Sequence, residues 1–145
     1  MADAGVPLTL LDTHVWIWMV EGDATQVGPE AVASIEDAAR GGAVCVSPIS
    51  VWEVAMLESR GRLSLSRALD DWVRAALGAP GVRLLPLSPE IAIESARLPG
   101  EPHGDPADRI LMASARILGA RLATCDRAIL EYSEGGRLSV LDARA

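Results

Sequence analysis

Four carboxylate side chains stand near points where apolar, strand-like runs give way to helical stretches. Asp12 directly follows the first run, and Asp126 closes the fourth. Glu53 lies one turn into the helix predicted after the second run, and Asp108 is the third residue of a helix predicted to begin at Pro106. Clustered carboxylates repel one another and raise one another's pKa values unless a cation neutralises them. If the four acids converge, their all-oxygen chemistry favours Mg²⁺ or Mn²⁺.

Each acid also has a structural explanation when it is considered alone. Four acids stand where a helix N-cap or an acidic first-turn residue is expected: Asp12, Asp105, Asp108 and Asp126. Ser50 and Glu53 match the S-x-x-E capping-box pattern. From the residues alone, metal ligands and helix caps therefore remain alternative interpretations.

The elements that must position these acids are visible as hydrophobic patterns. Short apolar runs predict five buried strands: Leu8 to Leu11, Ala43 to Val46, Val82 to Leu85, Arg121 to Thr124 and Leu138 to Leu141. Helical stretches, several with proline at or near the start, are predicted between them: Thr13 to Val20, Pro29 to Arg40, Pro48 to Arg60, Ser66 to Leu77, Pro89 to Arg97, Pro106 to Leu118 and Arg127 to Tyr132.

This order of elements predicts an α/β fold. Because the strands look apolar on both faces, we expect a parallel sheet that helices cover on both sides. Alternating strands and helices then give a three-layer α/β/α domain with right-handed crossovers. Ligands of such domains bind beyond the C-terminal ends of the strands, where all four acids are expected to lie. Capping alone does not require that convergence.

The composition bounds the domain organisation and the chemistry. The 145 residues, half of them hydrophobic, suit a single domain over residues 1–145 with its own core. All 13 basic residues are arginine, so there is no lysine for a P-loop, a Schiff base or a Ser-Lys pair. The formal net charge of −7 argues against strong unaided binding to nucleic acid, so a phosphate substrate would require a metal.

Two further features concern the compartment. Cys45 and Cys125 each fall in an apolar run without zinc-ligand spacing, so we expect both to be reduced core residues. The first residues lack the basic flank of a signal peptide, and no apolar run approaches the roughly 20 residues that cross a membrane. A cytoplasmic protein without membrane contact is therefore expected.

Four segments together resemble the PIN-domain toxins of the VapC type. The segments are Leu10-Leu11-Asp12-Thr13-His14 followed by Trp16 and Trp18, Ser50-Val51-Trp52-Glu53, His103-Gly104-Asp105-Pro106-Ala107-Asp108-Arg109, and Leu122-Ala123-Thr124-Cys125-Asp126. They occur in the family's order and spacing and run from about Leu8 nearly to the C-terminus. The sequence departs from the commoner family pattern, in ways that concern substrate binding more than metal binding, at Leu57, Gly104, Ala107 and Cys125.

The resemblance implies a fold, an activity and a site. The fold is a PIN-like domain with a central five-stranded parallel sheet, and the activity is that of a type II toxin, a Mg²⁺- or Mn²⁺-dependent ribonuclease that hydrolyses RNA phosphodiester bonds. Asp12 and Asp108 match direct metal ligands, and Asp126 a second-metal or water-mediated ligand. Glu53 matches a ligand or general base, and Asp105 an additional acidic position.

The resemblance also implies partners, namely an RNA substrate, a cognate antitoxin and a second copy in a homodimer. The apolar segment Trp16 to Val20 is a candidate dimer interface. We expect an antitoxin Arg or Lys to enter the acidic pocket, and an antitoxin helix to fill an apolar groove near the first and third helices. Thr13 and Ser50 are expected to hydrogen-bond carboxylates or phosphate, and Arg109 to pair with Asp105.

Two other functions fit parts of the sequence. A haloacid-dehalogenase-like phosphatase also places an Asp after its first strand, but its D-x-D element is missing because His14 occupies the second position. A catalytically inactive PIN-like module that only binds a partner protein would retain the acids as helix caps. Metal-dependent cleavage of RNA by the purified protein distinguishes these alternatives.

Overall fold

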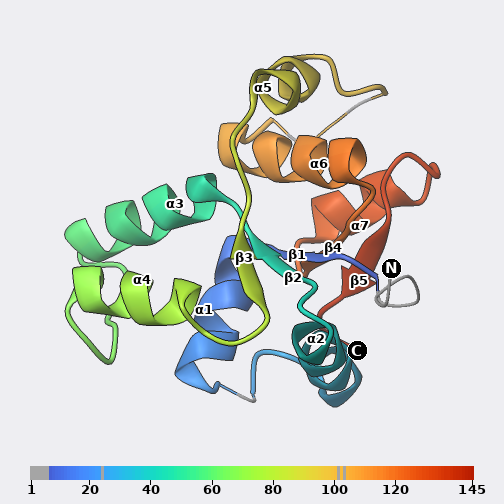
Figure 1. Cartoon of the computed structure of the whole chain (residues 1–145). Coiled ribbons are helices and arrows are strands. Elements are labelled where there is room, and N and C mark those ends of the chain that lie inside the picture. Colours follow the sequence, from blue (N-terminus) through green and yellow to red (C-terminus); the bar gives the residue numbers. More distant parts are fainter. Residues whose placement is uncertain (1–6, 24, 101, 103) are drawn as a thin grey trace.

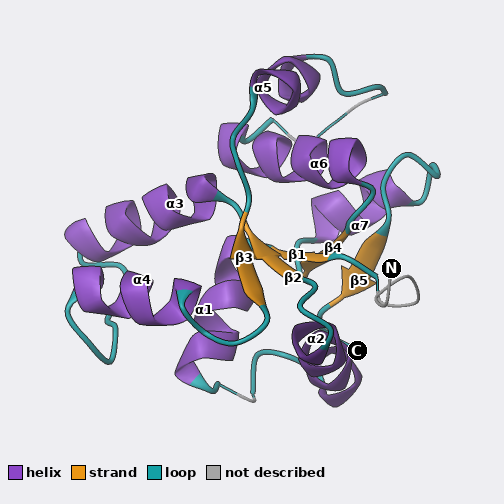
Figure 2. Ribbon diagram, viewed as in Figure 1, coloured by secondary structure: helices purple, strands orange, loops and turns teal. Residues whose placement is uncertain are grey.

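A parallel β-sheet organises the chain. The computed structural model describes residues 7–23, 25–100, 102 and 104–145, so His103 of the third motif lies outside the described residues. The strands have the order β3-β2-β1-β4-β5 in the sheet: β1 (Thr9–Leu11), β2 (Val44–Val46), β3 (Val82–Leu84), β4 (Arg121–Thr124) and β5 (Val140–Asp142). Helices flank this sheet on both sides, which confirms the predicted three-layer α/β/α fold (Figure 1, Figure 2).

The helices follow the predicted pattern closely. Within the described residues they are α1 (Thr13–Glu21), α2 (Pro29–Arg40), α3 (Pro48–Ser59), α4 (Leu69–Leu77), α5 (Pro89–Ala96), α6 (Pro106–Leu118) and α7 (Arg127–Ser133). Proline is the first residue of α2, α3, α5 and α6, where its missing N–H has no intrahelical partner to lose. None of the helices in this part of the chain is long and apolar enough to cross a membrane.

Alternating side chains along the strands build two separate cores. Leu11 belongs to a cluster that includes Trp16 of α1 and Trp72 of α4, whose rings meet edge to face at 5.0 Å. Leu10, its neighbour in β1, points the other way and packs in a second cluster with Leu111 of α6. Successive strand residues face opposite sides of a sheet, so this division places α1, α2 and α4 on one face and α5, α6 and α7 on the other.

The strand order also fixes where a ligand site should lie. The chain adds β2 and β3 on one side of β1, then returns to place β4 and β5 on the other side. The order therefore reverses between β1 and β4, which is the switch point where open α/β sheets bind ligands. Asp12 follows β1 at this point, and its backbone N–H donates to the carbonyl of Ala123 in β4 at 2.9 Å.

Three details of the sequence prediction were wrong. The strand β3 is not covered on both faces: it is one of the two outer strands of the sheet, and Leu84 is 51% exposed. The fourth helix begins at Leu69 instead of Ser66, because Ala68 is extended and Ser66 donates its hydroxyl to Glu21. Cys125 is only partly buried because β4 already ends at Thr124, whereas Cys45 is fully buried as expected.

Candidate active site

Asp12 is a buried carboxylate at the switch point of the sheet. It is the N-cap of α1, and its Oδ1 accepts a hydrogen bond from the Thr13 backbone N–H at 2.7 Å. Its Oδ2 accepts from the hydroxyl of Thr124, the last residue of β4, at 2.6 Å. Burial raises the pKa of Asp12, and the bonds from Thr124 and Thr13 oppose that rise because they stabilise the charged form.

The hydroxyl groups of Thr13 and Ser50 form a short hydrogen-bonded chain that holds the carboxylate of Glu53. Thr13 Oγ1 lies 2.5 Å from Glu53 Oε1 and 2.8 Å from Ser50 Oγ. A carboxylate only accepts hydrogen bonds, so with ionised Glu53 the Thr13 hydroxyl donates to it and Ser50 donates to Thr13. Burial raises the pKa of Glu53, the Thr13 bond lowers it, and repulsion by Asp12 and Asp105 raises it further.

The capping-box interpretation of Ser50 was wrong. Ser47, which precedes Pro48, is the N-cap of α3 and accepts from the Ile49 backbone N–H at 3.1 Å. Ser50 is instead fully buried and contacts the Thr13 hydroxyl, whereas Thr13 contacts a carboxylate, that of Glu53, as expected. Glu53 therefore lies further into α3 than a capping residue would, with its side chain turned toward the end of β1.

Two of the remaining acids cap helices, and all three act electrostatically on the same site. Asp105 is the N-cap of α6 and accepts from the Asp108 backbone N–H at 3.0 Å. Asp126 is the N-cap of α7 and accepts from the N–H groups of Ala128 and Ile129. Asp108 is in the first turn of α6. An acid in this fold can therefore cap a helix and also lie near the other acids of the site.

The pKa of Asp108 reflects the proximity of these acids. The pKa of Asp108 is raised to about 8, and burial is the largest cause. Repulsion by four other carboxylates contributes to the same rise: Asp12, Asp105, Asp126 and Glu53. These acids come from segments far apart in the sequence, so the sheet edge brings all of them within electrostatic reach of Asp108. Such crowding is unfavourable for the charged form of Asp108 in the absence of a cation.

The side chains do not form a closed coordination cage. Among the described residues, no three His, Cys, Asp or Glu side chains are arranged so that they could hold one metal ion together. The donor chemistry nevertheless fits a hard divalent cation, because the carboxylates offer only oxygen. Asp142 reaches the same sheet edge, opposite Thr124 in the β4–β5 pairing, but both of its oxygens accept from Arg144.

The structure gives Arg109 and Thr124 contacts that the sequence prediction did not include. Arg109 donates from Nε to the carbonyl of Ser95 at 2.9 Å, and thereby joins α6 to α5. Thr124 was not singled out as a site residue, although it contacts Asp12 directly. The T-x-D spacing of Thr124 and Asp126 was the available signal, but the partner of the hydroxyl is 112 positions away in the sequence.

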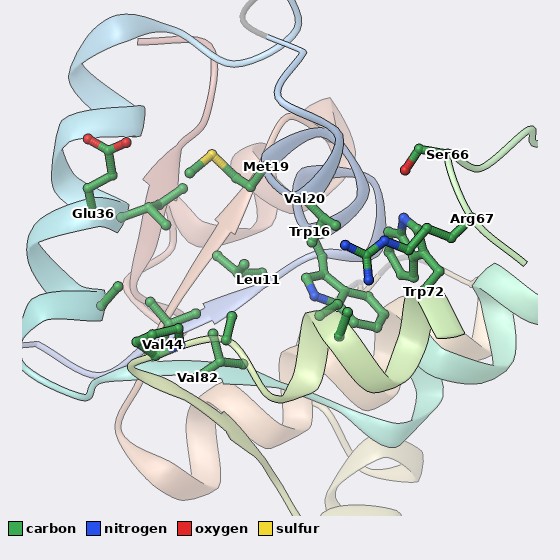
Figure 3. Close-up of a pocket in the computed structure, with 16 residues that line it drawn as sticks. Leu11, Trp16, Met19, Val20, Glu36, Val44, Ser66, Arg67, Trp72 and Val82 are labelled. Atoms are coloured by element: carbon green, nitrogen blue, oxygen red, sulfur yellow. The ribbon is translucent and has the colours of Figure 1, made fainter. Parts of the chain in front are cut away.

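A separate cavity of about 420 Å³ lies on the face formed by α1, α2 and α4 (Figure 3). Trp16 and Trp72 line it together with strand side chains, and Glu36 and Arg67 supply charges to the lining. None of the four acids Asp12, Glu53, Asp108 and Asp126 belongs to this lining. The acidic sheet edge and the apolar cavity are therefore distinct surfaces.

The chain is similar to known proteins over most of its length. The family model of the PIN domain matches residues 9–135. Ribonuclease VapC22 of Mycobacterium tuberculosis is 33% identical over 123 residues, which cover 85% of this chain and 90% of that relative. Similar folds occur in VapBC2 from Rickettsia felis bound to a promoter DNA fragment (TM-score 0.65, 14% identity) and in FitAcB from Neisseria gonorrhoeae (TM-score 0.58, 22% identity). Each of these two comparisons covers 92% of this chain and 96% of the other. Because the family model covers most of the chain and the VapC22 relative is 33% identical over most of both sequences, this chain belongs to the PIN-domain family and is of its VapC type.

Proposed function

We propose that this protein is a toxin ribonuclease that hydrolyses RNA phosphodiester bonds with Mg²⁺ or Mn²⁺ at the acidic sheet edge. The observation that carries the proposal is the convergence of carboxylates from separate segments: Glu53 contacts Thr13 beside Asp12, and Thr124 joins Asp12 to the turn of Asp126. The raised pKa of Asp108, caused by burial and by repulsion from these acids, agrees with this convergence. A stable domain that gathers carboxylates at the switch point of its sheet is suited to bind a cation there. The name of the VapC22 relative supports RNA as the substrate class.

The residues divide the work as follows. Asp12 and Asp108 would hold the cation directly, and Asp126 would bind a second cation or act through water. When bound, a divalent cation lowers the pKa of water and stabilises the charge that develops on the leaving oxygen. Thr13 and Ser50 orient Glu53, whose Oε2 is not engaged by Thr13 and would take the proton from the attacking water or join the ligands.

Cleavage of RNA by the purified, partner-free protein tests this function. We expect mixed cellular RNA to be cut with Mn²⁺ or Mg²⁺ and to remain intact with excess chelator, because the described site offers no alternative nucleophile constellation. Mapping the cut ends would identify the substrate at the same time. Undiminished cleavage in chelator would contradict metal dependence, and no cleavage with either metal would favour the inactive protein-binding module.

We propose that the partner that fits the apolar cavity is a cognate antitoxin. Several structures of similar fold are described as VapBC, FitAcB or toxin-antitoxin complexes. The cavity of this chain is bordered by α1, α2 and α4 and does not involve α3, unlike the groove expected from the sequence. We propose that an amphipathic antitoxin helix lies here and that a nearby antitoxin Arg or Lys enters the acidic edge.

A substitution in the cavity should separate inhibition from catalysis. Ala75 lines the cavity from α4 and is exposed, so Ala75→Arg fills the groove without disturbing the core. We expect antitoxin binding to weaken at least about tenfold, because an arginine blocks an apolar contact surface, and RNA cleavage by the free toxin to persist. The matched control is Ala33→Arg on an exposed part of α2 that does not line the cavity. Equal affinity for both variants, measured by titration calorimetry, would place the antitoxin elsewhere.

We propose a homodimer, and only the end of the expected segment Trp16 to Val20 is accessible to a second copy: Trp18 and Met19 are partly buried and Val20 is exposed. Trp16 and Ile17 are buried inside the chain and are not available to a second copy. Other large exposed apolar side chains include Trp52 of α3, Leu84 of β3 and Ile93 of α5. We expect a dimeric mass by light scattering at micromolar concentration, and a strictly monomeric mass would count against this assembly.

A further inference from the structure

Thr124 links the segment of Asp12 to the segment of Asp126 through hydrogen bonds of its side chain. Among the described residues, no other side chain does so. It ends β4, is fully buried, and lies beside β1 in the sheet. Its Oγ1 donates to Asp12 Oδ2 at 2.6 Å and accepts from the Asp126 backbone N–H at 3.0 Å. A buried hydroxyl needs partners, and both its donor and its acceptor capacity are used here for residues of the candidate site.

These bonds leave Asp12 little freedom. Its Oδ1 is engaged by the backbone N–H of Thr13 and its Oδ2 by Thr124, so both carboxylate oxygens are fixed by atoms of the fold. One constraint is local to the start of α1, whereas the other crosses from a strand 112 positions away in the sequence. Rotation of the carboxylate would break at least one of them. The remaining lone pairs of Asp12 are thereby kept in one orientation.

We propose that Thr124 is a positioning residue that orients Asp12 for cation binding and holds the turn of Asp126 at a fixed place beside it. The inference rests on the proposed metal-dependent function, and it adds a residue through which that site is organised. Groups that hydrogen-bond metal ligands typically contribute 10–100-fold to metal affinity. The hydroxyl of Thr124 acts in this way because it orders two acid-bearing segments before the cation arrives.

A buried threonine with a purely structural role would affect stability but not metal binding. Thr9 provides the comparison, because it is also fully buried and its Oγ1 also has two hydrogen-bond partners, Arg121 Nε and the carbonyl of Pro7. It lies at the start of β1, at the opposite end of that strand from Asp12. Loss of either hydroxyl costs stability, but only Thr124 contacts a candidate ligand.

Mn²⁺ binding to the full chain, measured by calorimetry or electron paramagnetic resonance, tests the proposal. We expect Thr124→Val and Thr124→Ala to raise the Mn²⁺ dissociation constant at least about tenfold. Thr124→Ser keeps the hydroxyl and should stay within about threefold of wild type, as should Thr9→Val. In RNA cleavage, saturating Mn²⁺ should restore most of the activity of Thr124→Val but not that of Asp108→Asn, which lacks a ligand.

The outcomes separate this inference from the proposed function. If wild type binds Mn²⁺ and the folded Thr124→Val or Thr124→Ala protein binds it within threefold of wild type, the positioning role is overturned and the function stands. Should Thr9→Val weaken Mn²⁺ binding as much as Thr124→Val, the effect is one of general stability and the positioning role is also overturned. A wild-type chain that binds no Mn²⁺ overturns both proposals. If Thr124→Val and Thr124→Ala both fail to fold, Thr124→Ser decides the matter. The positioning role is then overturned if Thr124→Ser loses the wild-type affinity for Mn²⁺.

Discussion

Asp108→Asn is expected to lower the kcat/KM of RNA cleavage on the order of 10³-fold while the domain stays folded. Asparagine has nearly the same size as aspartate but cannot supply the negative charge that holds a cation. Asp108 is also the acid on which the charges of Asp12, Asp105, Asp126 and Glu53 act together, so its loss affects the centre of the cluster. Cleavage assays at saturating metal, with circular dichroism as the folding check, measure the effect.

Asp71→Asn is the matched control for this substitution. Asp71 occupies the first turn of α4, as Asp108 does in α6, but it is exposed, and among the described residues its ion pair is with Arg74 on its own helix, at 3.3 Å. Removal of its charge should leave cleavage unchanged and alter the free energy of unfolding by less than about 1 kcal/mol. Wild-type turnover by Asp108→Asn would remove this residue from the proposed catalytic set, whatever the control shows.

The second large effect is on stability in metal-free buffer, which should fall as the pH rises from about 4 to about 8. Asp108 has a pKa near 8 in the folded chain, against an ordinary value of 3.8. Between these values the folded state retains a proton that the unfolded chain has released. The stabilising contribution is therefore complete below the unfolded pKa and is lost as the pH rises through the folded pKa. Burial raises the pKa of Asp12 and of Glu53 in the same direction.

Chemical denaturation with chelator at several pH values checks this dependence. Because Asp108 is partly accessible to solvent, we expect the loss attributable to it to be on the order of 1–3 kcal/mol, less than the full pKa shift implies. Asp108→Asn should flatten this decline and be more stable than wild type at pH 8, and Mn²⁺ should restore the wild-type stability. Asp71→Asn corrects for the general effect of removing one charge from an acidic chain. A wild-type profile that does not fall, or that falls equally in Asp108→Asn, would contradict the interpretation.

The order of the strands along the chain and the positions of many helix starts were determined by the sequence itself. Proline at the start of α2, α3, α5 and α6, and short apolar runs between the helices, are local signals that depend on neighbouring residues alone. The same local logic identified Asp12, Asp105 and Asp126 as caps. Because parallel strands share the direction of their carboxyl ends, the chain order also predicted that the acids would gather at one edge.

Tertiary structure alone decided which neighbours these residues meet. The exposure of β3 follows from its place as an outer strand of the sheet, and the short run Val82 to Leu85 does not by itself reveal whether it forms an outer or a central strand. Ser50 turned out to face Thr13 instead of capping α3, because Ser47 and Pro48 already form the helix start.

The bond between Thr124 and Asp12, like the effect of four other carboxylates on Asp108, depends on the pairing of β1 with β4. Hydrogen bonds and electrostatic repulsion act over a few ångströms in space, and distance along the chain does not report that separation. The sequence thus supplied the chemical groups and the edge at which they lie, while the packing of the sheet determined their partners and their charge states.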